Sequence, residues 1–397
     1  MIPAALLTLD AQAFAAGEDG ADRAISAPMN VASGLRAPSP MLVARFPDAA
    51  TANRRLAGMS AVGRWAARAR EAGASLAVVA PGVVGGVGGG AQPWPATTLD
   101  DFARAGATPL LADVPPPALP LFDGRRLPDA AALKAALRGV PLARESTIDL
   151  ADEPAALRDL LRATAKPGDG IVSRWLNRPV SQRITALLLR YLPDIRPSHA
   201  TVVVGAVAVA MVACLLFGGA AGLIAGGVLF HVASVLDGVD GELARTTYRS
   251  SAAGRALDTR VDMLTNIGFF VGITVSLTRL YGGAQAMVGA LVVVLALGGL
   301  AMVTWLARRA GSGGSLDVLK PYYRERFPSG WQYWLTEALV LSTSRDFFAF
   351  ALGIVIVVGL GWTVSWLLLG FVLAWLTAVV CAIPGVLRQA ELRPRAA

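Results

Sequence analysis

Residues 236–262 read LDGVDGELARTTYRSSAAGRALDTRVD and place four aspartates beside two long apolar segments. These segments, at about 220–246 and 254–279, have the length and hydrophobicity of membrane-spanning helices. A carboxylate at or inside the membrane boundary is costly unless a partner neutralises it. The first candidates for a functional site are therefore Asp237, Asp240, Asp258 and Asp262.

Helical spacing brings these carboxylates together. Asp237 and Asp240 are separated by three residues on one helix, and Asp258 and Asp262 by four on the next. Four like charges at close range repel strongly in a low dielectric, so cations or retained protons are required. Hard divalent ions suit an all-oxygen site, and Mg²⁺, which keeps waters that substrate phosphates can replace, is the natural candidate.

Two other interpretations of the aspartates stay open from the residues alone. One is a set of helix-end ion pairs with Arg245, Arg255 and Arg260. The other is a cation pathway, as in a cation-coupled transporter. A transporter predicts cation flux without any chemical product.

The composition agrees with a membrane protein. Of 397 residues, 54% are hydrophobic and 16% charged, against about 25% charged in ordinary soluble domains. This excludes a wholly soluble protein and a disordered chain. We expect six spans and, before them, an amphipathic helix in 175–197 that lies on an anionic membrane surface. The spans are expected at about 198–217, 220–246, 254–279, 284–307, 346–362 and 364–386.

Basic residues predict the orientation. The net charge is +8, and with six spans the loops rich in Arg and Lys fall on one side. Both termini and the region before the spans are therefore expected in the cytoplasm, in a multi-pass protein of the inner membrane, with no need for a nucleic-acid partner. The bases and aromatics of 320–334 predict a segment at the membrane surface.

The first 170 residues are expected to form a cytoplasmic α/β domain. An apolar stretch at 41–46, a helical pattern at 54–74 and a strand-like stretch at 76–82 follow one another. Apolar pieces at 109–112 and 118–122 are expected to extend the sheet. The predicted domains are thus 1–170 and a membrane domain of 171–397.

The aspartates also belong to a longer pattern, D-x2-D-G-x2-A-R-x8-G-x3-D-x3-D, which resembles the signature of the CDP-alcohol phosphotransferase family at every fixed position. Upstream, PSHAT at 197–201 is similar to the Pro-Asn-x-x-Thr that opens the first span in this family, with Ser198 in place of Asn. The resemblance covers about residues 170–397.

The resemblance implies an enzyme that displaces CMP from a CDP-alcohol and joins two alcohols through a phosphodiester, in phospholipid or inositol-phosphate biosynthesis. The donor is CDP-diacylglycerol or a CDP-polyol such as CDP-inositol. The family also suggests a homodimer and contact with membrane lipids. Two divalent ions, Mg²⁺ or alternatively Mn²⁺, are implied. Their ligands would be Asp237, Asp240, Asp258 and Asp262; Asp262 would also be the general base, and Gly241, Ala244, Arg245 and Gly254 would line the cytidine site.

Three residues outside the signature have two interpretations each. Arg345 either anchors the start of a span or binds the phosphate of the acceptor alcohol. His231 is expected to be a packed helix-interface residue rather than a ligand. His199 either caps the first span or touches substrate, and we favour the cap.

The junction KPGDGIVSRWLNRPVSQRIT, residues 166–185, resembles fusions of an inositol-phosphate cytidylyltransferase with a di-myo-inositol-phosphate phosphate synthase. The front region is accordingly similar to a nucleotidyltransferase. Residues 41–55, however, lack the glycines of a phosphate loop, and the glycine-rich stretch 82–90 contains no Lys or Arg. We favour a degenerate, non-catalytic front domain over a bifunctional enzyme that also makes its own CDP-alcohol.

Overall fold

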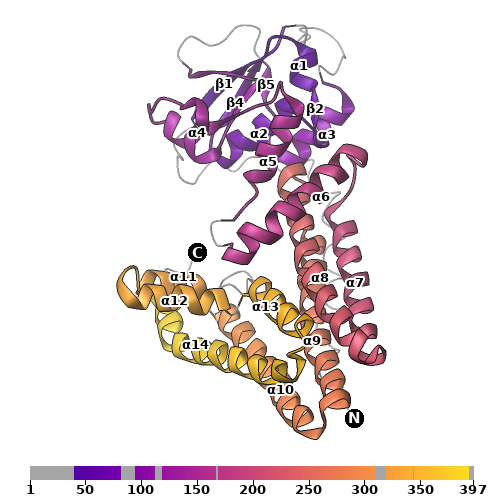
Figure 1. The fold of residues 1–397 in the computed structure, drawn as a ribbon. Helices are drawn as coiled ribbons and strands as arrows, with labels where there is room; N and C mark the ends of the chain where they lie inside the picture. Colours follow the sequence, from indigo (N-terminus) through magenta and orange to yellow (C-terminus); the bar gives the residue numbers. More distant parts are fainter. Residues whose placement is uncertain are drawn as a thin grey trace, which may run out of the picture. The chain divides into compact units, whose positions relative to one another are not determined.

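The computed structural model describes residues 40–81, 94–111, 119–166, 169–309, 319–342 and 344–392. Within them, a small α/β region precedes a set of long helices (Figure 1). The glycine-rich stretch 82–90 lies outside the described residues, as does the segment before residue 40. The interpretation of the stretch 82–90, that it does not form a phosphate-binding loop, therefore stays a prediction.

A four-stranded parallel sheet organises the α/β region. Its strands are β1 (Met41–Arg45), β4 (Ser75–Val79), β5 (Leu110–Leu111) and β6 (Leu121–Asp123), in the order β5-β4-β1-β6. Val43 pairs with Ala77 on one side and Leu121 on the other. The expected extension of the sheet by the two later apolar pieces is confirmed.

The predicted helix at 54–74 is wrong in its first part. A hairpin of β2 (Arg55–Leu56) and β3 (Met59–Ser60) comes first, and α2 begins only at Ala61, covering Ala61–Glu71. Ala57 and Gly58 both have left-handed backbone angles, with φ of 48° and 71°, as a tight two-residue turn requires. Ser60 then caps α2, because its Oγ accepts from the Gly63 N–H at 3.2 Å.

The core of this region lies between the sheet and its helices. Trp65 of α2 is fully buried beside Phe46 and Leu133, and its Nε1 donates to the carbonyl of Gly124 at 2.8 Å. The remaining elements are α1 (Ala49–Asn53), α3 (Ala96–Ala105), β7 (Arg126–Pro128), α4 (Ala130–Ala136), η2 (Arg144–Ser146), β8 (Thr147–Asp149) and α5 (Glu153–Arg162).

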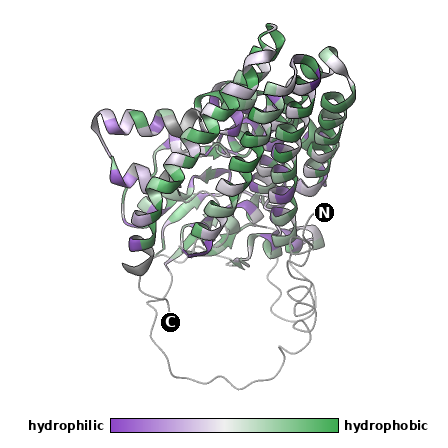
Figure 2. Ribbon diagram, turned by 90° about the horizontal axis from the view of Figure 1, so that it is seen from below, coloured by the Kyte–Doolittle hydropathy of each residue, from purple (hydrophilic) through white to green (hydrophobic). Residues whose placement is uncertain are grey.

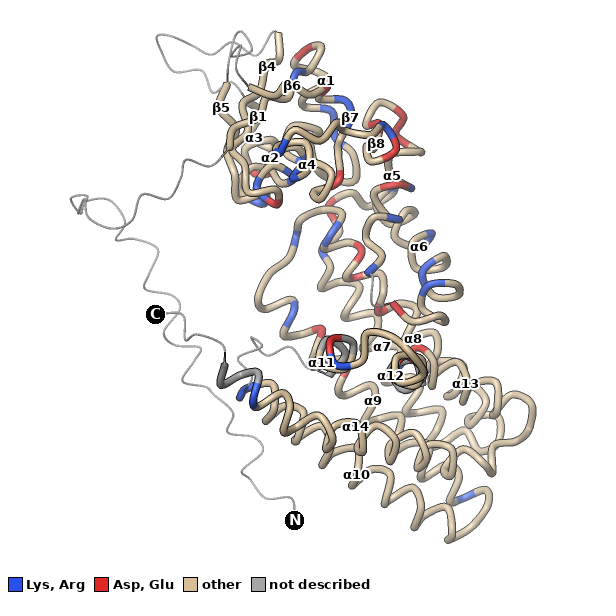
Figure 3. Tube along the Cα trace, turned by 90° about the vertical axis from the view of Figure 1, so that its left-hand side faces the viewer, with Lys and Arg blue, Asp and Glu red and all other residues tan. Residues whose placement is uncertain are grey.

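Five helices of the described chain are long and apolar enough to cross a membrane. Hydrophobic residues follow their lengths (Figure 2). In Figure 3, acidic and basic residues gather in the α/β region and around α6 and α8, whereas α10 and α14 carry few. These helices indicate a membrane protein. They are α7 (Pro197–Phe217), α8 (Gly219–Thr247), α9 (Ala252–Tyr281), α10 (Gly283–Arg309) and, within Gly361–Arg388, most of α14 (Val364–Leu392).

The segment expected as the fifth of six spans forms a shorter helix. Helix α13 (Arg345–Val357) has 13 residues, or about 20 Å, against about 30 Å for the hydrocarbon core of a bilayer. The turn η4 (Gly361–Thr363) joins it to α14. The stretch expected at the membrane surface contains α11 (Leu319–Arg326) and the start of α12 (Gly330–Ser342). The six-span count stays a prediction.

The expected amphipathic helix is present as a π-helical turn, η3 (Ser173–Asn177), followed by α6 (Arg178–Tyr191). Its polar side chains Ser181 and Thr185 are fully buried, whereas several apolar ones are exposed. That it lies at a membrane interface stays a prediction. The exposed apolar residues are Trp175, Leu176, Val180, Leu187 and Tyr191.

Aromatic packing joins α8, α9 and α13 within the helical part. The rings of Phe230 and Phe269 stack with centroids 3.8 Å apart and planes 5° from parallel, and Phe348 lies 5.7 Å from Phe230. All three belong to one buried cluster or its border. This packing fixes the two aspartate-bearing helices against α13.

Candidate active site

A tight turn returns the chain from α8 to α9. Helix α8 ends at Thr247, the following Tyr248 has a left-handed φ of 55°, and Ser251 caps α9 by accepting from the Gly254 N–H at 2.9 Å. A Cβ at Gly254 would meet the Ser251 Oγ at 3.0 Å, so glycine leaves room for the cap. The two helices therefore run back side by side, and the aspartates of both face one site.

Three of the four signature aspartates form a cluster. Asp237, Asp258 and Asp262 each offer a carboxylate oxygen, and these oxygens lie within 4.8 Å of one another. All three side chains are partly buried. Asp240 is nearly buried and adjoins Asp258. The convergence expected from helical spacing is thus what the structure shows.

Asp240 is oriented from a third helix. The Oγ1 of Thr201, on α7, donates to Oδ2 of Asp240 at 2.8 Å, and both residues are buried. Thr201 is the last residue of the PSHAT motif. The motif therefore contributes a hydroxyl that fixes one carboxylate, a role that the sequence did not assign to it.

Arg345 lies inside the cluster. Its Nη1 donates to Asp262 and lies 3.5 Å from Asp237, and the side chain is 15% exposed. Arg345 therefore points toward the aspartates, and not only toward the start of its own helix as an anchoring residue would. In the described part of the chain, the aspartates make no ion pair with Arg245, Arg255 or Arg260, the partners expected for a purely structural cluster.

Asp346 holds the start of α13 beside the cluster. Its Oδ1 accepts from Ser234 Oγ on α8 at 2.6 Å and from Asn177 Nδ2 at 3.1 Å. Three elements, η3, α8 and α13, thus meet at one carboxylate. Sequence reasoning missed Asn177 and Ser234 because neither has a distinctive neighbour along the chain.

A second missed group lies on the opposite face of α8. The fully buried Glu242 accepts from Ser181 Oγ at 2.6 Å, Thr185 Oγ1 at 2.7 Å and Arg178 Nη1 at 3.0 Å. Arg178 also bonds Asp169, at 2.8 Å. A buried carboxylate without partners is strongly destabilising, and these three donors offset the cost of burying Glu242. Glu242 occupies a variable position of the signature, so only its burial reveals it.

The residues expected at the cytidine site lie between the two pairs of aspartates along the chain. Gly241, Ala244 and Arg245 follow Asp240 on α8, and Gly254 precedes Asp258 on α9. Gly241 lies next to Asp240, and the Arg245 side chain folds back over it, since a Cβ at Gly241 would be 3.0 Å from Arg245 Nη1. Ala244 and Arg245 line a cavity at the end of α8. That these residues bind cytidine stays a prediction.

The two histidines lie outside the cluster. His231 packs against Phe350, with ring centroids 5.5 Å apart, in keeping with a helix-interface residue. His199 is exposed, and no side chain caps the start of α7. The expected cap is therefore wrong, since Arg196, whose side chain has no acceptor, occupies the capping position and His199 is the third residue of the helix.

The donor set suits a hard cation. The cluster offers only carboxylate oxygens, the ligands that Mg²⁺ and Mn²⁺ prefer, and it contains no imidazole or thiolate among the described residues. Arg345 pairs with two of the four aspartates, Asp237 and Asp262, and its single positive charge leaves negative charge for a divalent ion. The residues therefore fit a divalent metal site.

Comparison with known proteins agrees with the signature. Residues 195–383 match the model of the CDP-alcohol phosphatidyltransferase family. The candidate site lies inside this matched region. This match confirms the family resemblance that the spacing of the aspartates predicts, and all four aspartates, Thr201 and Arg345 fall within the matched region.

Named relatives share part of this chain. The bifunctional IPC transferase and DIPP synthase of Thermococcus kodakarensis is 32% identical over 166 residues, which cover 42% of this chain and 35% of that protein. The protein of the same name from Aquifex aeolicus is 35% identical over 111 residues, 28% of this chain and 24% of its own. The chain thus matches about a third or less of the length of these relatives.

The Glu242 network predicts a stability effect. Replacing Glu242 with Ala leaves Arg178 with one acidic partner and removes the carboxylate that joins Arg178, Ser181 and Thr185 to α8, so we expect the free energy of unfolding to fall by about 3–5 kcal/mol. Thermal or denaturant unfolding in detergent measures it. The control is Glu153→Ala, an exposed residue in the first turn of α5. Equal stability of the two variants would show that the network does not hold α6 to α8.

Proposed function

We propose that this chain transfers a phospho-alcohol group from a CDP-alcohol to an alcohol acceptor, forming a phosphodiester and releasing CMP. The supporting observation is the aspartate cluster on α8 and α9, which contains three of the four acidic residues of the signature and lies inside the region that matches the family. A CDP-polyol such as CDP-inositol is the favoured donor, because the similar proteins carry the names IPC transferase and DIPP synthase. CDP-diacylglycerol is the other donor.

Four carboxylates would hold two divalent ions, with Mg²⁺ as the first choice and Mn²⁺ as the second. Such ions, when bound, neutralise the charge of a diphosphate and favour loss of its leaving group. Asp237, Asp240 and Asp258 are the proposed ligands, and Asp262 completes the set. Thr201 keeps one of these carboxylates in place through its hydrogen bond to Asp240.

Asp262 is the proposed general base. Its carboxylate takes the proton of the acceptor hydroxyl as the hydroxyl oxygen forms a bond to the β-phosphorus, and the bond from that phosphorus to the oxygen of CMP breaks. The contact with Arg345 orients the Asp262 carboxylate. Arg345 also has two buried donors, Nε and Nη2, without a partner among the described residues. They support the idea that it binds a phosphate on the acceptor.

The proposed setting is an inner membrane crossed six times, with both termini in the cytoplasm, α6 at the interface and two copies of the chain in a dimer. The exposed apolar side chains of α6 support its interfacial position. Residues 1–170 and 171–397 remain our proposed domains. The short α13 is the weakest of the six proposed spans, since its 13 helical residues reach only part of the way across.

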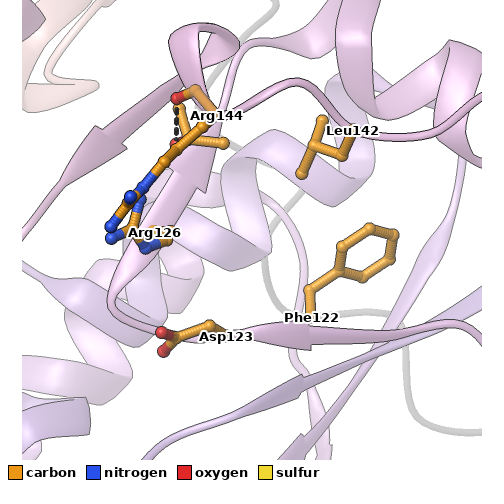
Figure 4. A pocket seen from close by; sticks show the side chains of 6 residues that line it. Phe122, Asp123, Arg126, Leu142 and Arg144 are labelled. Carbon is orange, nitrogen blue, oxygen red and sulfur yellow. Dashed lines mark hydrogen bonds between the residues drawn. The ribbon is translucent and has the colours of Figure 1, made fainter.

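We further propose that the front domain does not make CDP-alcohol. In an active nucleotidyltransferase the loop after the first strand presents backbone N–H groups to phosphate. Here Asp48 occupies that place and accepts from the Thr51 N–H at 2.6 Å, so the chain's own carboxylate caps α1. A pocket of about 370 Å³ at the end of β6 contains Asp123, Arg126 and Arg144 (Figure 4). It is the feature that favours the bifunctional alternative.

Replacing Asp262 with Asn tests the general base. We expect CMP release from CDP-inositol or CDP-diacylglycerol, with Mg²⁺, to fall by about 100-fold or more, because a positioned base contributes at least that much. The control is Asp100→Asn on the exposed face of α3. Undiminished CMP release would contradict the assignment, and cation flux into vesicles without any CMP would favour the transporter.

Replacing Arg345 with Ala tests the acceptor site. We expect the Michaelis constant for a phosphorylated acceptor to rise by about tenfold, since a charged hydrogen bond is lost. The constant for an acceptor without phosphate should change much less, and Arg345→Lys should recover part of the affinity. If both acceptors respond equally, Arg345 acts only on the aspartates.

Incubating the full chain with CTP and inositol phosphate tests the front domain. We expect no pyrophosphate, because residues 41–55 lack the glycines of a phosphate loop and Asp48 occupies the N–H of Thr51. A coupled pyrophosphate assay measures it, with Asp262→Asn protein to remove any later step. Release of pyrophosphate would establish the bifunctional enzyme.

A further inference from the structure

A strongly basic cavity lies at the end of α8, where its last turn meets α2, α3 and α5. Its volume is about 510 Å³, within the range of about 300–1,000 Å³ of small-molecule sites. None of the clustered aspartates lines it. Among the described residues, its wall contains a single acid, Glu71, and five arginines: Arg64, Arg68, Arg70, Arg104 and Arg245.

Arg64 is the most buried of these arginines, with 1% of its surface exposed. Its Nη1 donates to the carbonyl of Thr246 at 2.8 Å and its Nη2 to that of Leu56, while Nε has no partner. In the described part of the chain it pairs with no carboxylate. Burial lowers the pKa of Arg64 to about 10, so the group is still charged at neutral pH. A buried, unneutralised positive charge is therefore present in the wall.

Other buried donors in the same wall lack acceptors. Thr246 is 2% exposed, and its hydroxyl has no hydrogen-bond partner. The buried Nε atoms of Arg68 and Arg245 also have no partner. Buried polar atoms are nearly always hydrogen-bonded, and leaving one unsatisfied is costly. Several such donors around one cavity indicate a missing acceptor with more than one oxygen.

Hydrogen bonds to the carbonyls at the end of α8 explain only some of the arginines that line the cavity. Arg64 bonds the carbonyl of Thr246, and Arg104 bonds that of Thr247 at 3.1 Å, so both satisfy carbonyls at the negative end of α8. Arg70 donates to the carbonyl of Ala105, the last residue of α3, at 2.9 Å. Neither Arg68 nor Arg245 has such a role, and the unpartnered donors are left without explanation.

We propose that this cavity binds a phosphate-bearing anion, which joins the α/β region to the last turn of α8. Phosphate oxygens accept several hydrogen bonds from arginine at once and carry the charge that the wall lacks. A nucleoside phosphate and a lipid head group share this chemistry. Because α8 also carries Asp240, six residues before Thr246, the ligand would stabilise the helix on which the aspartates lie. The cavity shares Ala244 and Arg245 with the expected cytidine site, so the test below leaves out any CDP-alcohol and its outcome is separate from that of the proposed transfer.

Binding to the full-length protein in detergent tests the proposal, without any CDP-alcohol present. Calorimetry with pyrophosphate probes a soluble source, and a short-chain phosphatidic acid probes a lipid source. We expect one of them to bind and to raise the midpoint of thermal unfolding. Binding of pyrophosphate alone assigns a soluble ligand, and binding of phosphatidic acid alone a lipid.

Two variants of opposite effect make the result specific. Arg68→Gln should weaken binding by about tenfold, because it removes a charged donor, while the fold persists since Arg68 is partly exposed. Glu71→Gln should tighten binding several-fold, because it removes the single acid of the wall. Arg158→Gln, an exposed arginine of α5 outside the cavity, is the control. The proposal is overturned if neither probe binds, or if the Arg68 and Glu71 variants bind as the unaltered protein does.

Discussion

Negative charge in apolar surroundings is the constraint around which the helical half is arranged. Asp237, Asp258 and Asp262 lie within 4.8 Å of one another on two mostly hydrophobic helices. Their mutual repulsion must be offset, or the pair of helices does not assemble. Two further helices supply what is needed: α13 contributes Arg345, and α7 contributes the hydroxyl of Thr201. The site thus draws on four helices, although its signature covers two.

The sequence predicts the aspartate site well because all of its information is local. Spacings of three and four residues place side chains on one face of a helix, and a short turn between α8 and α9 brings the faces together. The parallel sheet is predictable for a similar reason, since each apolar piece is one strand. Arg345 could not be assigned in this way, because 83 residues separate it from Asp262 and nothing in its surroundings indicates the contact. Glu242 was missed since the sequence does not tell which face of α8 is buried.

Turns that include glycine shorten two helices that the sequence predicts. Residues 54–60 read as helix because Arg, Leu, Ala and Met favour helices, yet Ala57 and Gly58 adopt left-handed angles and reverse the chain. Residues 346–362 are predicted to span the membrane because every residue after Asp346 is apolar, and within them α13 ends at Val357, before Gly359 and Gly361. In both places a turn that includes glycine overrides the surrounding composition.

Helix α6 has the opposite pattern to helices of water-soluble proteins, since it buries hydroxyls against Glu242 and exposes Val180, Leu187 and Tyr191. Helix α12 likewise exposes Trp331 and Trp334. Aromatic and aliphatic groups left in water promote aggregation. Purification of the protein therefore requires an amphiphile that covers these two helices as well as the five long ones. A detergent with a large micelle or a lipid disc should keep the protein monodisperse better than a small, harsh micelle.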